Sequence, residues 1–139
     1  EFWRILAGLH QQGTSVIVAT PYMDEAERCT RIAFIDRGRI RHQGTPAEIK
    51  ALVPGRLIEV LADDPRAALA ALRGLPEAAS PHLFGDVVRV LWQVPDDPAP
   101  VIVDFLTAAG IAGATVRGTD MDMESAFAFL AESATAGAA

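Results

Sequence analysis

Three blocks of sequence decide the fold of the first part of the chain: VIVATPYMDEAER (16–28), RIAFIDRGRI (31–40) and GTPAE (44–48). The apolar run at 15–19 lacks alternation, which predicts a strand buried on both faces of a parallel sheet. A short helix is expected at 24–30, with acidic residues near its N-terminus, where the helix dipole favours them. The second block predicts strands at 32–36 and 39–43, joined by a tight turn at Arg37-Gly38.

The third block predicts the start of a helix. Thr45 would be its N-cap, Pro46 its first residue, and Glu48 would complete a capping box. A Pro-Gly breaker follows at Pro54-Gly55 and separates the chain into two parts. We therefore expect one unit over residues 1–53 and a second over residues 56–132, followed by a flexible tail over 133–139.

Upstream of these blocks the chain opens within an amphipathic helix, because apolar residues recur at i, i+3, i+4 and i+7: Phe2, Ile5, Leu6 and Leu9. Gly13 is a candidate C-cap for this helix. A natural chain rarely begins in this way, so we expect a segment of a longer protein. One buried-type strand and one hairpin cannot form a stable domain alone, since a parallel strand needs neighbours. Those neighbours are expected upstream of Glu1 or from another molecule.

The second part predicts a complete small domain. Strands are expected at 56–62, 78–84, 87–94 and 114–117, with helices that begin at Asp63-Asp64-Pro65 and Asp97-Pro98. The order β-α-β-β-α-β is that of the ferredoxin-like plan, an α+β fold. A last helix is expected at 123–132, with Asp122 as its N-cap.

Composition limits the function classes. The 139 residues carry a net charge of −6 and the cations are scattered, so a nucleic-acid role is not expected. No apolar run approaches the roughly 20 residues that span a bilayer, so direct membrane insertion is not expected. Cys29 is the only cysteine, which excludes an internal disulfide and fits a cytosolic location.

The three blocks, in this order and spacing, resemble the end of the nucleotide-binding subunit of ABC transporters, over roughly residues 1–52. The resemblance implies an α/β fragment of an ABC-type ATPase core. It implies ATP and Mg²⁺ in the longer parent chain, which would be an ATP hydrolase driving export, with multidrug export as one form. It also implies permease subunits and a second ATP-binding unit as partners. The protein would lie in the cytoplasm, peripheral to the inner face of the cell membrane through the permease.

The chemistry of the family does not carry over intact. The chain lacks the phosphate-cradling loop GxxxxGK followed by Ser or Thr, so no cofactor-binding or metal-binding residue is predicted within it. The family's switch histidine would fall between Thr20 and Tyr22, where this chain has Pro21. Proline has no hydrogen-bond donor, so no catalytic residue is predicted here either. We interpret this as a degenerate ATP site in the parent; the alternative is that another residue replaces the histidine.

Residues after 55 resemble the accessory domain of bacterial drug- and lipid-exporter ATPases, in part through the helix that begins MESAF (123–127). A structural and regulatory role for this segment is the first hypothesis, with no hydrolysis by the segment alone. A small-molecule sensor and a homodimerisation module are the alternatives.

Remaining candidate residues receive simpler interpretations. Asp24, Glu25 and Glu27 could pair with a permease helix, or form a solvated acidic face. Cys29 is interpreted as a small buried hydrophobe. The remaining predictions place His10, His42 and His82 at the surface, Asp36 in a turn, and Trp3 and Trp92 in a core or interface.

Overall fold

The computed structural model describes residues 1–136. Over this range the elements are, in chain order, α1 (Phe2–Gln11), α2 (Met23–Ala26), β1 (Ile32–Asp36), β2 (Arg39–Gly44), α3 (Pro46–Ala51), β3 (Arg56–Leu61), α4 (Pro65–Leu72), β4 (Ala78–Phe84), β5 (Val87–Trp92), α5 (Pro98–Ala108), β6 (Thr115–Thr119) and α6 (Met123–Ala136). Helix α6 extends past its predicted end at residue 132, and residues 137–139 of the predicted tail lie outside the described residues.

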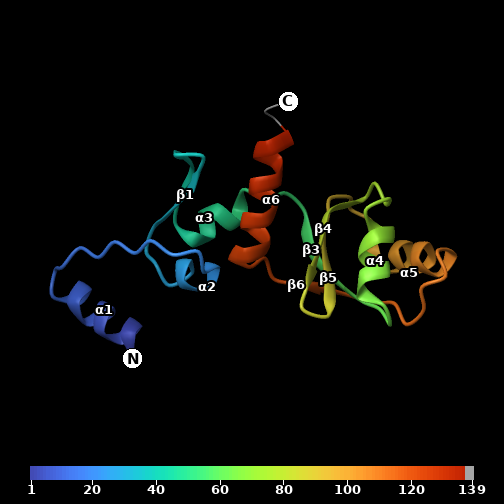
Figure 1. Cartoon of the computed structure of the whole chain (residues 1–139), viewed down its shortest axis with the longest axis horizontal. Coiled ribbons are helices and arrows are strands. Elements are labelled where there is room, and N and C mark those ends of the chain that lie inside the picture. Colours follow the sequence, from blue (N-terminus) through green and yellow to red (C-terminus); the bar gives the residue numbers. More distant parts are fainter. Residues whose placement is uncertain (137–139) are drawn as a thin grey trace.

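The N-terminal arm departs from prediction. Helix α1 forms as expected, and Gly13 follows it with a positive φ of 88°, but α1 buries none of its residues. The segment 14–20 is extended without any strand pairing, and Ile17 is 97% exposed. The predicted strand at 15–19 is therefore wrong for this chain, because a parallel strand forms only where neighbouring strands take up its backbone hydrogen bonds. Figure 1 shows α1 at one end of the molecule, joined to the rest by this extended segment.

The hairpin of β1 and β2 confirms the prediction. Asp36 pairs with Arg39, and the two residues between them, Arg37 and Gly38, have φ values of 48° and 74°. Positive φ at both central positions is the type I′ geometry that matches the twist of the two strands. A register shift lies between Phe34 and Ile35.

Local hydrogen bonds set the helix ends of the first part. The Thr45 N–H donates to Glu48 Oε2 at 2.7 Å, and the Glu48 N–H donates to Thr45 Oγ1 at 3.2 Å, which confirms the capping box of α3. Helix α2 is shorter than predicted. After Ala26 the backbone N–H groups of Arg28 and Cys29 bond three residues back, a tightening that ends the helix.

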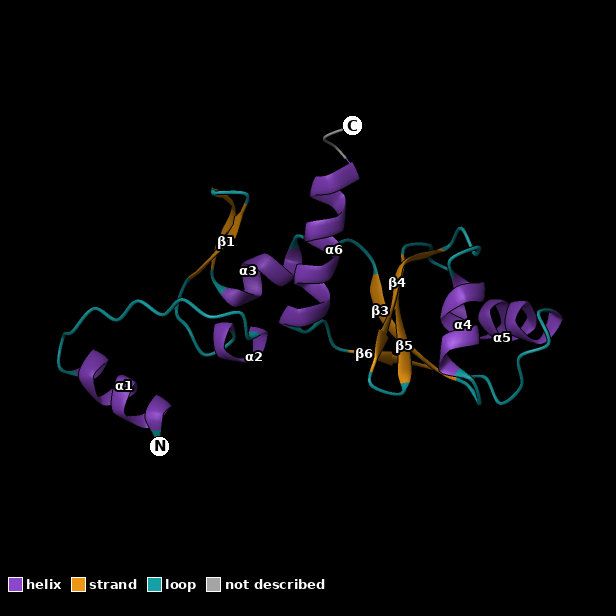
Figure 2. Cartoon of the chain, viewed as in Figure 1, coloured by secondary structure: helices purple, strands orange, loops and turns teal. Residues whose placement is uncertain are grey.

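The second part forms a four-stranded sheet with the order β4-β5-β3-β6, and all neighbouring strands are antiparallel. Asp64 caps α4 and Asp97 caps α5, as predicted from the Asp-Pro pairs. Helices α4 and α5 lie on one side of this sheet, and α6 with α3 and α2 on the other, as Figure 2 shows.

Each face of the sheet has its own hydrophobic core. The first core joins β3, β4 and β5 to α4 and α5, and its buried members include Val60, Leu72, Val90, Trp92 and Leu106. This confirms Trp92 as a core residue. The second core lies under α6 and crosses the predicted boundary between the two parts: Phe34, Ile49, Val53, Leu57, Leu91, Met123, Ala126 and Leu130. The boundary at Pro54-Gly55 is therefore a break in secondary structure across which packing is continuous.

The close approach of Gly55 to β5 yields a testable prediction. Gly55 has a φ of 98°, and a Cβ at this position would lie 2.6 Å from the Trp92 carbonyl oxygen. Left-handed backbone alone costs a non-glycine residue about 1 to 2 kcal/mol, and the clash with backbone adds to that. Gly55→Ala should therefore lower the free energy of unfolding, measured in urea, by more than Gly85→Ala. Gly85 is the matched control, because its φ is 63° and nothing lies within 4 Å of its Cβ position. Equal losses in the two variants would contradict this account.

Candidate functional site

The switch position predicted from the sequence lies at an exposed bend. Pro21 directly precedes the N-cap of α2, Tyr22. The Tyr22 N–H donates to Thr20 Oγ1 at 3.0 Å, which closes a turn around the proline. Pro21 contributes no donor of its own, on backbone or side chain. The segment that carries the proline thus leads directly into α2. The contacts of α2 therefore determine the position of this segment.

Helix α2 is tied to α6 by Glu27. Its Oε1 accepts a hydrogen bond from the backbone N–H of Met123, the first residue of α6, at 2.9 Å. The same oxygen lies 3.3 Å from Lys50 Nζ of α3. A carboxylate at this end of α6 is favoured by the helix dipole and satisfies a backbone donor that has no partner within the helix. Glu27 therefore has a structural contact that neither sequence interpretation of the acidic residues included.

Arg89 of β5 is the centre of a buried ionic network. Its Nη2 lies 3.0 Å from Glu59 Oε1 of β3, and its Nη1 lies 2.6 Å from Asp122 Oδ2. Nη1 also donates to Ser125 Oγ at 3.3 Å, and the guanidinium lies 3.6 Å from the centre of the Phe84 ring. Arg89 is 8% exposed and Glu59 6%. Since a buried charge is tolerated only when it is paired and hydrogen-bonded, these contacts are what allow Arg89 in this strand.

Asp122 and Glu59 each link the network to a further element. Asp122 is the N-cap of α6, as predicted, and its Oδ1 accepts the Ser125 N–H at 2.8 Å. Glu59 Oε2 lies 2.6 Å from Nη2 of the largely exposed Arg117 on β6. The network thus joins β3, β5, β6 and the first turn of α6.

The electrostatics of the two carboxyl groups have opposing causes. Desolvation by burial is the largest single effect on the Glu59 carboxyl and acts to raise its pKa, but the hydrogen bonds and positive charges of Arg117 and Arg89 together outweigh it, and the net pKa is lowered. For Asp122, desolvation also acts to raise the pKa, and the hydrogen bonds from Ser125 together with Arg89 lower it overall. Both groups are therefore stabilised as carboxylates in the folded chain.

Sequence reasoning did not single out this network. The one available signal was a lone Arg in the fully buried strand VVRVLW (87–92) and a lone Glu in the strand RLIEVL (56–61). A single charge within an apolar strand implies a buried partner, but the sequence alone does not say which one.

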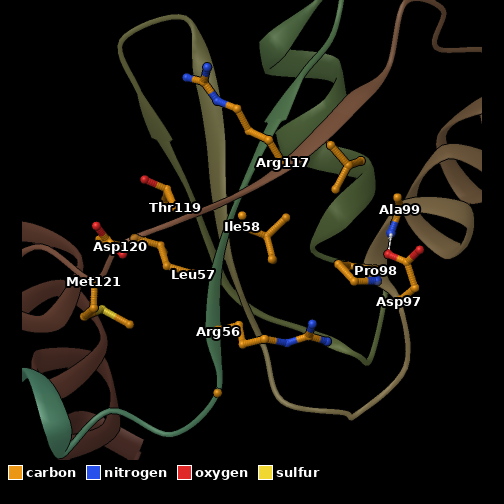
Figure 3. A pocket seen from close by; sticks show the side chains of 13 residues that line it. Arg56, Leu57, Ile58, Asp97, Pro98, Ala99, Arg117, Thr119, Asp120 and Met121 are labelled. Atoms are coloured by element: carbon orange, nitrogen blue, oxygen red, sulfur yellow. Dashed lines mark hydrogen bonds between the residues drawn. The ribbon is translucent and has the colours of Figure 1, made fainter.

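An open groove of about 700 Å³ lies beside β3, β6 and the start of α5, as Figure 3 shows. Three of the charged side chains that line it are already bonded to other groups of the chain. Arg56 Nη2 donates to the Asp96 carbonyl at 2.7 Å, Asp97 Oδ1 accepts the Ala99 N–H at 3.1 Å, and Arg117 pairs with Glu59. These groups stabilise the rim of the groove, and the groove gives the sensor hypothesis little support.

The remaining candidates are dispersed. His10 is exposed and His42 half-buried. The prediction that His82 is exposed is wrong. It is half-buried, its Nδ1 lies 3.0 Å from the Ser80 carbonyl oxygen, and its Nε2 is buried without a hydrogen-bond partner among the described residues. A bulge between Ala79 and His82 shifts the register here. Cys29 is half-buried. Across residues 1–136, no group of three or more His, Cys, Asp or Glu side chains is placed to hold a metal ion.

The Arg89 network predicts a large effect of one substitution. Arg89→Met would leave Asp122 without its cation and Glu59 with Arg117 alone. Breaking a buried pair in this way costs about 3 to 5 kcal/mol, to be read from urea unfolding monitored by tryptophan fluorescence. The control is Arg41→Met, because the Arg41–Asp36 pair is partly exposed at 3.4 Å and such pairs contribute about 0 to 1 kcal/mol. Comparable losses of unfolding free energy in the two variants would show that burial does not strengthen the contribution of the Arg89 contacts to stability.

The lowered pKa values predict a loss of stability in acid. A carboxyl group whose pKa is lower in the folded chain stabilises the fold above its unfolded pKa, about 4 for Asp and Glu. That stabilisation is lost as the pH falls through the folded pKa. The free energy of unfolding should therefore decrease between about pH 5 and pH 3. Glu59→Gln should decrease less steeply, since Glu59 no longer titrates. Parallel curves for the two chains would contradict the role of Glu59.

None of the helices described over residues 1–136 is long and apolar enough to cross a membrane. No protein-family model matches the chain.

Comparison with curated proteins finds several relatives. The chain is 43% identical over 51 residues to the probable multidrug ABC transporter ATP-binding protein YbhF of Escherichia coli, which covers 37% of this chain and 9% of that protein. It is 35% identical over 65 residues to the daunorubicin/doxorubicin resistance ATP-binding protein DrrA of Streptomyces peucetius, a match that covers 46% of this chain and 20% of that protein. It is 32% identical over 111 residues to the Nod factor export ATP-binding protein I of Burkholderia thailandensis, a match that covers 78% of this chain and 35% of that protein.

The chain spans about a third or less of the length of each of these three proteins. All three are named as ATP-binding proteins, of transport, resistance or export systems. The chain is therefore homologous to a segment of the ATP-binding proteins of ABC transporters.

Proposed function

We propose that this chain is the C-terminal part of the ATP-binding subunit of an ABC exporter, which uses ATP to drive export across the membrane, with multidrug export as one form. The observation that carries the proposal is the extent of one match. Similarity to the Nod factor export protein covers 111 residues, more than either predicted part, 1–53 or 56–132, can hold. The similarity to a relative named for export therefore extends across the predicted boundary between the two parts.

In this proposal the groups that bind ATP and Mg²⁺ belong to residues that precede Glu1 in the parent chain. The parent is an ATP hydrolase, and this segment does not hydrolyse ATP alone. Its partners are permease subunits and a second ATP-binding unit, and it lies at the cytoplasmic face of the cell membrane through the permease. The unpaired segment 14–20 and the exposed apolar stripe of α1, including Phe2 and Ile5, support this view. Both have the chemistry of surfaces that pack against a larger core.

Pro21 occupies the position where the family resemblance places a histidine. A histidine there would donate a hydrogen bond toward the terminal phosphate of ATP, and proline cannot. The exposed bend at Pro21, directly before α2, supports an assignment of this segment as the switch loop. We infer a degenerate ATP site that works beside a second, intact site on another unit.

Residues 56–132 form a ferredoxin-like accessory domain in this proposal. The element order β3-α4-β4-β5-α5-β6 and the antiparallel strand order β4-β5-β3-β6 support the assignment. Packing of the second hydrophobic core across the boundary favours a structural and regulatory role over an independent sensing module. Homodimerisation through a sheet edge remains the second alternative, and light scattering on the purified chain would detect it.

The proposal predicts a gain of activity from one substitution. Pro21→His, made in the full-length subunit assembled with its permease, should raise ATP hydrolysis at this site by at least about tenfold, because one positioned hydrogen-bond donor to developing negative charge contributes about 10²- to 10³-fold. Pro21→Ala is the control, since it removes the proline ring without adding a donor. The degenerate-site proposal fails if the unmodified protein is already fully active at both sites and Pro21→His changes nothing. It also fails if Pro21→Ala raises the rate as much as Pro21→His.

A further inference from the structure

We propose that the first turn of α6 couples the position of the accessory sheet to the switch segment Thr20-Pro21-Tyr22. The inference rests on the proposed function only for the meaning of that segment; the coupling itself follows from contacts within the chain. Three links are required, from the sheet to α6, from α6 to α2, and from α2 to Pro21.

The link from the sheet to α6 is an ion pair between the buried Arg89 and the partly exposed Asp122. Arg89 Nη1 holds Asp122 Oδ2 at 2.6 Å and Ser125 Oγ at 3.3 Å, so two residues of the first turn bind one guanidinium of β5. Arg89 is in turn fixed by Glu59 of β3 through two bonds of 3.0 and 3.1 Å. Both of these bonds end on the same oxygen, Oε1 of Glu59. The contacts resist sliding, because a displacement would leave the buried Arg89 charge without its partners.

The link from α6 to α2 involves Met123, which directly follows Asp122 in the same turn. The Met123 N–H donates to Glu27 Oε1 at 2.9 Å, across the boundary between the two parts. Apolar contacts reinforce this bond, since Met23 and Ala26 of α2 pack on the second core, which contains Met123 and Ala126. The first turn of α6 is thus held by β5 through its N-cap carboxylate and by α2 through its first backbone donor.

The link from α2 to the switch position is covalent and short. Helix α2 begins at Met23, two residues after Pro21, and is four residues long. Its backbone bonds begin at the Tyr22 carbonyl, which accepts the Ala26 N–H at 3.4 Å. A single turn has little stability of its own. Its position therefore depends on the contact with α6, and Pro21 moves with it.

Coupling is a free energy shared between two sites and must act in both directions. The test uses the 139-residue chain as it stands, with amide hydrogen exchange measured residue by residue by NMR. Asp122→Asn keeps an oxygen that can cap Ser125 but removes the charge that holds Arg89. We expect exchange of the Ala26 and Glu27 amides, at the end of α2, to accelerate by a factor at least about threefold larger than that of the Val88 and Val90 amides of β5, which report any loss of global stability.

The reciprocal variant is Glu27→Ala, which removes the acceptor for Met123. It should accelerate exchange of the Ala126 amide, whose N–H donates to the Asp122 carbonyl at 3.1 Å in the first turn of α6. The matched control is Asp36→Asn, which neutralises a carboxylate in a partly exposed pair on the hairpin. It should leave all of these amides unchanged.

Two results would overturn the proposal. In the first, Asp122→Asn loosens α6 but leaves the α2 amides at their original rates. In the second, the α2 and β5 amides accelerate by the same factor, which would indicate global destabilisation. Neither depends on ATP or on the permease. Failure of the coupling therefore leaves the ATPase assignment standing, and a full-length protein without ATPase activity would leave the coupling standing.

Discussion

The Arg89 guanidinium imposes the constraint on which most of this structure depends. It lies in the middle of a strand whose six residues are all buried, on the face that carries α6. A charge in that position must be neutralised and its donors satisfied, so Glu59 and Asp122 have fixed places around it. Asp122 caps α6, and α6 covers the second core, so the ionic requirement of one side chain determines where the last helix of the chain begins.

The same helix joins the two parts of the chain. Residues of the first part, including Phe34 and Ile49, share a core with Leu91 of the sheet and with α6. The rings of Phe34 and Phe127 of α6 meet edge to face with their centres 5.0 Å apart. The hairpin, α2 and α3 thus gain from α6 the cover that they lack by themselves. Helix α1 buries none of its residues, and Ile17 of segment 14–20 is 97% exposed.

How much of this was predictable from the sequence follows from the range of the interactions. The capping box of Thr45, the Arg37-Gly38 turn and the Asp-Pro helix starts are local, and each was predicted correctly. The pairing of Arg89 with Asp122 spans 33 residues, and the bond from Met123 to Glu27 spans 96. No periodicity encodes such pairs. The strand predicted at 15–19 failed for the opposite reason, because its apolar run was recognised correctly but its partners are absent. At the candidate site, Pro21 was found through family resemblance alone. Glu27 was identified as one of three acidic residues, but its bond to the Met123 N–H was not predicted.

The most direct test of the central proposal, that this chain is the C-terminal part of an ABC exporter ATPase, is to determine the coding sequence immediately upstream of Glu1. The account predicts a continuous reading frame that contains the phosphate-cradling loop GxxxxGK followed by Ser or Thr, a signature sequence and an acidic strand that precedes the switch segment. A reading frame that begins at or near Glu1 would contradict it. The chain would then be a stand-alone module without an ATP site, and the search for its function would turn to ligands of the four-stranded sheet.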